Sequence, residues 1–195
     1  VFFLVDTPLT VTLEVTPTAI IAGETSVLTA AVKNDASDDV ADGTPVLFVT
    51  ENGSGPVYQV GIVSGGVASV AAQPTRAGSA TVTAICGEAL DAGVIDVSPG
   101  PVAHVWVTAT PDVIAANGIS ASLVLVDLRD AYANGVPGAP VDLLASPGII
   151  APAQATSDVS GQVTASLTST TPGAGMVLSL IHISEPTRLL STSYA

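Results

Sequence analysis

Few side chains in this 195-residue sequence could support chemistry. Cys86 is the only cysteine, so the chain can form neither an internal disulfide nor a multi-cysteine metal site. It continues the alternation of Val82 and Ala84, which predicts a buried thiol acting as a small hydrophobic group; a reactive or cross-linking thiol is the alternative. The histidines are His104 and His182. Because no acid–base pair accompanies them in a matching motif, we expect no catalytic residues and no enzyme activity.

Four aspartates lie close together in one segment, and their carboxylates are the best candidates for binding a metal ion. They are Asp35, Asp38, Asp39 and Asp42. Carboxylate oxygens are suitable ligands for Ca²⁺, but this spacing matches no EF-hand loop. We therefore expect a solvated acidic loop, with a weak calcium site as the alternative and no other cofactor.

Charge and composition exclude two classes of partner. The chain has 17 acidic and 4 basic residues, and its formal net charge of -13 repels nucleic-acid phosphates and anionic lipid head groups. Thr, Gly, Asp or Pro interrupts every apolar run before it reaches the roughly 18 residues that a membrane helix needs. We expect no binding to nucleic acid and no direct insertion into a membrane.

Sequence repeats divide the chain into two similar units. The segment Gly43–Val46 recurs as Gly138–Val141, and Gly66 recurs as Gly161, both at an offset of 95 residues. Two prolines restrict the backbone of the segment between the units. We predict a remnant of an upstream segment at 1–8, a first domain at 9–98, a linker at 99–101, a second domain at 102–177 and a separate tail at 178–195.

The hydrophobic pattern has a period of two in both units. Apolar and polar residues alternate over 10–16, and apolar residues occupy every second position from 124 to 128. Such alternation is typical of strands with one buried face. Further short runs at 45–50, 57–63, 67–71 and 80–86 are separated by Gly, Pro, Asn and Asp. We predict an all-β fold of two tandem sandwiches closed by Greek-key connections.

Turn positions and the junction between the units lead to two further predictions. We expect Gly43, Gly66, Gly135 and Gly161 to reverse the chain at positive φ, where a residue with a β-carbon is disfavoured by roughly 1 kcal/mol. His104 and Trp106 could line a ligand pocket. We favour the interpretation that they cover the junction, because the valines at 105 and 107 take the inward positions and leave Trp106 on the other face.

The order of short motifs in the second unit resembles a known domain family. The motifs occupy 128–141, 157–164 and 169–173. They are similar to the patterns V-x-D-x-x-G-x-P-V-x-G-x-x-V, T-D-x-x-G-x-A and T-x-x-A-G of the bacterial Ig-like domain, group 1, which is repeated in invasin- and intimin-type adhesins. The first unit has a weaker form and carries residues 35–42 in place of the family's N-G turn. The resemblance covers nearly all of 9–177 and implies two tandem Ig-like sandwiches.

This resemblance implies a structural role. It points to non-enzymatic stalk repeats of a bacterial adhesin, anchored in the outer membrane at the cell surface or secreted, which present a distal binding module. The implied partners are neighbouring Ig-like repeats of the same chain, with a host-cell or extracellular ligand bound through domains outside this sequence. The alternative is an accessory Ig-like module of a secreted polysaccharide-active hydrolase, which an exposed row of aromatic residues would favour. Aromatic residues make up only 4% of the chain.

Both ends of the sequence indicate a fragment, of the kind that metagenomic sequencing yields. Val1 is not an initiator Met and no secretion signal follows it, so we expect the native chain to begin upstream. Residues 178–188 match the in-frame translation of a transposase-type sequencing adaptor at all eleven positions, and 189–195 fit its continuation with one departure, Thr192. The second domain would then lack its native final strand after Val177, and a strand over 178–183 would reflect chance β character. Three tail residues would carry no biological information: His182, Glu185 and Arg188.

Overall fold

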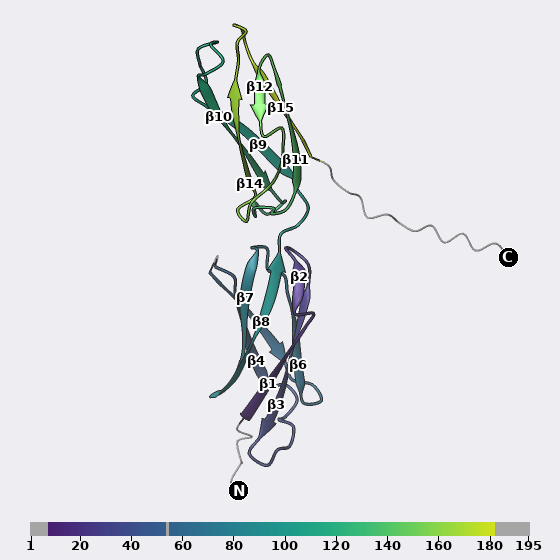
Figure 1. Ribbon diagram of the computed structural model, residues 1–195. Coiled ribbons are helices and arrows are strands. Elements are labelled where there is room, and N and C mark those ends of the chain that lie inside the picture. Colours follow the sequence, from purple (N-terminus) through teal and green to yellow (C-terminus); the bar gives the residue numbers. More distant parts are fainter. Residues whose placement is uncertain (1–7, 54, 182–195) are drawn as a thin grey trace, which may run out of the picture. The chain divides into compact units, whose positions relative to one another are not determined.

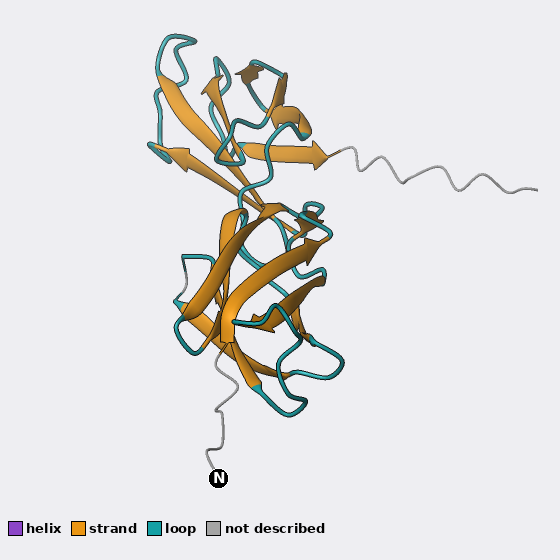
Figure 2. Ribbon diagram, turned by 90° about the horizontal axis from the view of Figure 1, so that it is seen from below, coloured by secondary structure: helices purple, strands orange, loops and turns teal. Residues whose placement is uncertain are grey.

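The computed structural model describes residues 8–53 and 55–181, which form two compact units that divide between Gly100 and Pro101. The described residues form strands, turns and loops, without a helix (Figure 2). No segment of the described chain is therefore a helix that could cross a membrane. The predicted all-β fold is confirmed.

The first unit is a sandwich of eight strands (Figure 1). One sheet has the order β1-β3-β6 and the other the order β2-β8-β7-β4-β5. Most pairs are antiparallel, whereas β2 runs parallel to β8. Strands that are distant in sequence lie side by side, as Greek-key connections require. The strands are β1 (Pro8–Thr16), β2 (Ala19–Ile21), β3 (Ser26–Asn34), β4 (Pro45–Glu51), β5 (Pro56–Ile62), β6 (Val67–Ala72), β7 (Gly78–Cys86) and β8 (Ala89–Ser98).

Alternating residues of these strands build one core between the two sheets. In β3, Leu28, Ala30 and Val32 are fully buried, and the intervening residues face outward. Phe48 of β4 and Ile95 of β8 are among the largest buried side chains that pack in the same cluster. Each such side chain stabilises the fold by roughly 1.5 to 3 kcal/mol relative to its exposed state. The period-two pattern of the sequence therefore corresponds to the core of this unit.

The second unit repeats this plan with seven described strands. Its sheets have the orders β12-β14-β10-β9 and β13-β11-β15. Val124, Val126 and Leu128 of β10 are fully buried and stand 96 residues after the buried residues of β3. The strands are β9 (His104–Thr110), β10 (Ala121–Arg129), β11 (Pro140–Ser146), β12 (Ile149–Ala151), β13 (Gln154–Thr156), β14 (Gln162–Thr168) and β15 (Met176–Ile181).

The sequence patterns missed strand β8. It pairs with β7 along nine residues, from Gly78↔Val97 to Cys86↔Ala89. Its sequence contains Asp91 and Gly93, which weaken the strand pattern. The Asp91 carboxylate accepts the backbone N–H groups of Leu13 (2.8 Å) and Ala92 (2.9 Å), which lowers the pKa of this carboxyl. The aspartate thus connects β8 to β1 instead of ending the strand.

A counterpart of β8 in the second unit would fall at 184–193, at the offset of 95, and lies outside the described residues. In the first unit, β8 passes so close to β1 that a Cβ at Gly93 would stand 2.9 Å from Val15 Cγ2. In the second unit, Val105 and Val107 pair with the buried Leu128 and Val126, yet they are 40% and 39% exposed. Their pairing places them on the same face of the sheet as these buried residues, as predicted.

Strand β15 includes the first residues of the adaptor-like tail. Leu178 to Ile181 pair with β11, where Leu143↔Ser179 is one of the pairs. The Ser179 hydroxyl is buried and makes no hydrogen bond within the described chain, whereas Ala84 fills the matching position of β7. An unpaired hydroxyl in a core position costs about 1 to 3 kcal/mol. This supports the chance-strand interpretation, and the origin of 178–195 stays a prediction.

Candidate functional site

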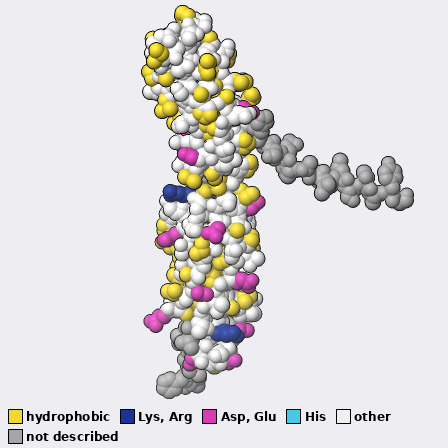
Figure 3. Space-filling model, viewed as in Figure 1, with side chains coloured by type: hydrophobic (Ala, Val, Ile, Leu, Met, Phe, Trp, Pro, Cys, Tyr) yellow, Lys and Arg dark blue, Asp and Glu magenta, His cyan; other side chains and the backbone are white. Residues whose placement is uncertain are grey.

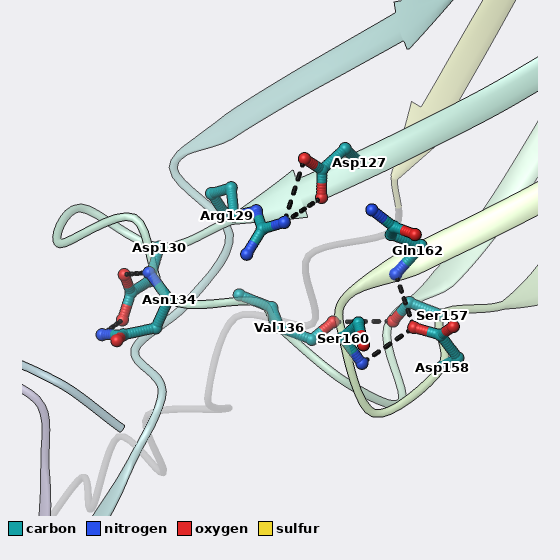
Figure 4. A network of polar contacts seen from close by, with 9 residues as sticks. All are labelled: Asp127, Arg129, Asp130, Asn134, Val136, Ser157, Asp158, Ser160 and Gln162. Atoms are coloured by element: carbon teal, nitrogen blue, oxygen red, sulfur yellow. Dashed lines mark hydrogen bonds and ion pairs between the residues drawn. The ribbon is translucent and has the colours of Figure 1, made fainter. Parts of the chain in front are cut away.

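A group of hydrogen-bonded polar side chains lies in the loop after β10 in the second unit. Asp130 is buried, and its Oδ1 accepts the backbone N–H groups of Tyr132 and Asn134, both at 2.8 Å. Its Oδ2 accepts Asn134 Nδ2 at 2.8 Å. Figure 4 shows this carboxylate directed into its own loop rather than toward an open surface. The carboxylate is a structural cap for the loop.

The loop after β3 in the first unit has the same hydrogen-bond pattern. Asn34 Oδ1 accepts the N–H groups of Ala36 and Asp38, both at 3.0 Å. The residues at the fourth position of the two loops, Ser37 and Ala133, both have positive φ, at 66° and 64°. Residues 34–38 therefore adopt the same turn as residues 130–134, because Asn34 takes the place of Asp130.

Glycines hold these loops against the neighbouring turn, and three of the four predicted positions are confirmed. Gly43, Gly66 and Gly161 have positive φ, at 93°, 80° and 80°. Gly135 is a correction: it is not among the positive-φ residues, and a Cβ there would collide with the Ser160 carbonyl oxygen. The glycine at 135 is required by close approach of two backbones rather than by chain reversal.

Replacing Asp130 by alanine is expected to destabilise the second unit by about 1 to 3 kcal/mol, because buried N–H groups lose their acceptor. Asp130→Asn keeps one acceptor oxygen, as Asn34 does in the first unit, and should cost less. Urea unfolding followed by Trp106 fluorescence measures both variants, since this is the only tryptophan. Equal losses for the two variants would contradict the cap.

The four aspartates of the first unit do not converge on one point. Asp39 Oδ1 lies 2.9 Å from Lys33 Nζ, and Asp42 Oδ1 accepts the Gly65 N–H at 2.8 Å. Among the described residues, no group of three or more His, Cys, Asp or Glu side chains is arranged to hold a metal ion. The geometry favours the solvated loop, and weak calcium binding by the four aspartates, Asp35, Asp38, Asp39 and Asp42, stays a prediction.

Cys86 is 3% exposed at the end of β7. Its Sγ lies 3.5 Å from the Pro45 carbonyl oxygen, which it can reach as a weak donor. Burial raises the pKa of this thiol, so that less reactive thiolate is present at neutral pH. The prediction that the Cys86 thiol is buried is confirmed.

We expect Ellman's reagent to modify Cys86 at least tenfold more slowly in the folded chain than in guanidinium chloride, because the reagent needs an accessible thiolate. Raising the pH from 7 to 9 should accelerate the folded-state reaction, since the raised pKa leaves the thiol mostly protonated at pH 7. Equal rates in the folded and unfolded chain would contradict burial.

Strand β9 and its neighbours carry a mixed aromatic and polar surface that the motifs did not predict. The rings of His104 and Trp106 stack with centroids 5.5 Å apart. Their cross-strand partners on β10 are Arg129 and Asp127, which form an ion pair at 2.9 Å. Gln162 of β14 pairs with Asp127 from the other side. The sequence did contain a sign of this surface. Asp127 and Arg129 alternate with the buried residues of β10, so they had to lie on the same face of the sheet as Trp106.

This surface does not extend into a row of aromatic residues. The exposed aromatics of the described chain are Tyr58, Trp106 and Tyr132, which lie on β5, on β9 and in the loop after β10. One aromatic pair beside an ion pair can stack on a planar group and donate hydrogen bonds. The expectation that His104 and Trp106 cover a junction between the units stays a prediction.

A comparison with known protein families covers most of the second unit. Residues 104–184 match the model of the bacterial Ig-like domain, group 1. The second unit is a bacterial Ig-like domain of group 1. The matched range contains β9 to β15 and ends within the adaptor-like tail. No curated protein matches the chain by sequence.

Several solved structures are similar to this chain. InvD of Yersinia pseudotuberculosis is 21% identical with a TM-score of 0.55, over 88% of this chain and 52% of InvD, and this similarity shows the fold. Invasin, described as a bacterial integrin-binding protein, is 26% identical with a TM-score of 0.47, over 89% of this chain and 36% of invasin. The D0-D1 fragment of intimin is 21% identical with a TM-score of 0.38, over 92% of this chain and 93% of the fragment. The chain thus spans about a third of the invasin structure and half of InvD.

Proposed function

We propose that the two units are non-enzymatic spacer repeats of a bacterial adhesin, located at the cell surface or secreted, and that they hold a distal binding module away from the envelope. The family match and the Ig-like fold shared with InvD support this assignment. In this proposal the partners of each unit are neighbouring repeats of the same chain, and ligand binding belongs to domains outside this sequence.

The segment between the units is the observation that carries the proposal. β8 ends at Ser98 and β9 begins at His104. Backbone hydrogen bonds fasten both ends of this segment: the Ala22 N–H donates to the Ser98 carbonyl at 2.9 Å, and the Ala103 N–H donates to the Arg129 carbonyl at 2.8 Å. Pro99 and Pro101 fix φ between them. A short joint with few free backbone dihedrals limits the bending of one unit against the next, as a spacer needs.

A reach experiment tests the spacer role. The full chain is fused in front of a module of known affinity, and residues 8–100 are deleted in a second fusion. Because the longest strands of the first unit have nine or ten residues, deletion should shorten the reach by roughly 30 Å. The distance at which surface-tethered fusions capture a tethered ligand measures this change. The affinity of the module in solution should stay the same, and a fall in that affinity would overturn the proposal.

A further inference from the structure

The outer face of the five-stranded sheet in the first unit is apolar, although outer faces of antiparallel sheets are usually polar. One row of cross-strand neighbours crosses four strands without a polar residue, since Leu47 pairs with both Val60 and Ile85, and Ile85 pairs with Leu90. Val60 is 61% exposed and Leu90 is 62% exposed. We call the whole surface the apolar outer face; it comprises Leu47, Val49, Tyr58, Val60, Ile62, Ile85, Leu90 and Val94.

These residues lie on the opposite side of the sheet from the core. The residues between them on β4 and β7, such as Phe48 and Ala84, are buried. A second row adds Tyr58 and Val49, which pair with each other, and continues through Thr83 and Ala92. The apolar outer face therefore does not contribute to the core of its own sandwich, and the largest apolar patch on a protein surface is often functional.

Charged groups lie at the margins of this face. Glu51 is in the row beyond Tyr58 and Val49, Asp96 is one row further, and Glu88 lies in the turn between β7 and β8. The chain as a whole is acidic, with a net charge of -13, and acidic side chains outnumber basic ones on the face shown in Figure 3. If two acidic chains met at their apolar outer faces, no carboxylates would lie opposite each other at the centre of the contact.

We propose that the apolar outer face docks on the same face of a second copy of this chain, sheet against sheet. An isologous contact requires a self-complementary surface, and a neutral apolar sheet packs on its own copy at about 10 Å, as the two sheets of a sandwich do. Four strands and three rows give a footprint of roughly 400 Å² per copy. This is below the roughly 800 Å² per partner of a standard stable interface, so the dimer is weak and forms at high local concentration.

Sedimentation velocity of the full chain tests this proposal. From ~5 to ~500 µM, the weight-average sedimentation coefficient should rise toward that of a dimer. Val60→Glu and Leu90→Glu each place a carboxylate at one end of the apolar row, within the docking face, and each should weaken dimerisation at least tenfold. Val27→Glu is the matched control, because Val27 is 45% exposed on β3 in the other sheet, and it should dimerise like the parent chain.

Folding and orientation are checked separately. Circular dichroism should show all three variants folded, since the substituted side chains are outside the core. Oxidation of Val60→Cys should produce a disulfide-linked dimer faster than oxidation of Val27→Cys, with Cys86 buried in both. A parent chain that remains monomeric at every concentration would overturn the proposal. An effect of Val27→Glu as large as that of Val60→Glu would overturn it as well.

Discussion

Replacing Phe48 by alanine is expected to lower the unfolding free energy of the first unit by about 3 to 5 kcal/mol, because the ring leaves a cavity in a packed core. Phe48 is 1% exposed and lies in the core cluster of that unit. Since the second unit has a separate core cluster, its transition should not move. Separate unfolding of the two sandwiches is the expected consequence of their separate cores.

The chain contains a reporter for each unit, so this prediction can be measured without added labels. Trp106 fluorescence follows the second unit, and the reactivity of the Cys86 thiol follows the first. The reciprocal variant is Leu143→Ala, which empties the position 95 residues later in the other core. It should shift only the tryptophan transition. If either variant moved both transitions equally, the two units would form one cooperative body.

Adding a copy of strand β8 to the second unit is expected to stabilise that unit by at least about 2 kcal/mol. In the proposed chimera, a copy of Thr83–Ser98 replaces residues 178–195 after Val177, the residue equivalent to Val82 at the offset of 95. The copied segment ends β7 and provides β8, which covers β1 in the first unit. In the second unit it should cover Val105 and Val107 of β9 and supply an alanine in place of Ser179.

The urea midpoint of Trp106 fluorescence measures the gain. A second chimera with aspartate at the copied positions of Ile95 and Val97 is the control, because these two side chains are buried in the first unit. It should show little stabilisation over the parent chain. An unchanged midpoint in the first chimera would mean that the second unit does not accept a strand equivalent to β8.

Much of the sandwich could be predicted because its strands bury alternate residues. The runs at 45–50, 57–63, 67–71 and 80–86 correspond to β4 to β7. Strand β8 escaped because Asp91 and Gly93 are typical of turns. Their roles depend on β1: the carboxylate accepts the Leu13 N–H, and the missing side chain at Gly93 leaves room for Val15. A period-two pattern cannot reveal that Asp91 accepts a hydrogen bond from a residue 78 positions earlier in the sequence.

The loops show a similar limit. Comparison of motifs indicated an altered turn at 35–42, yet Asn34 and Asp130 form equivalent caps. The equivalence becomes visible only when the accepted N–H groups are known, because the amide and the carboxylate each offer an oxygen at the same place. For the same reason, the sequence indicated four clustered aspartates but did not show that Asp39 pairs with Lys33.

The central claim, that this chain contributes spacing, is tested most directly by the distance between its two units in solution. Nitroxide labels at Thr12→Cys and Thr164→Cys lie on exposed positions of β1 and β14, while buried Cys86 stays unlabelled. Double electron–electron resonance should give one narrow distance distribution that broadens when Pro99 and Pro101 are replaced by glycine. A broad distribution in the parent chain, equal to that of the glycine variant, would contradict a spacer with a restricted joint.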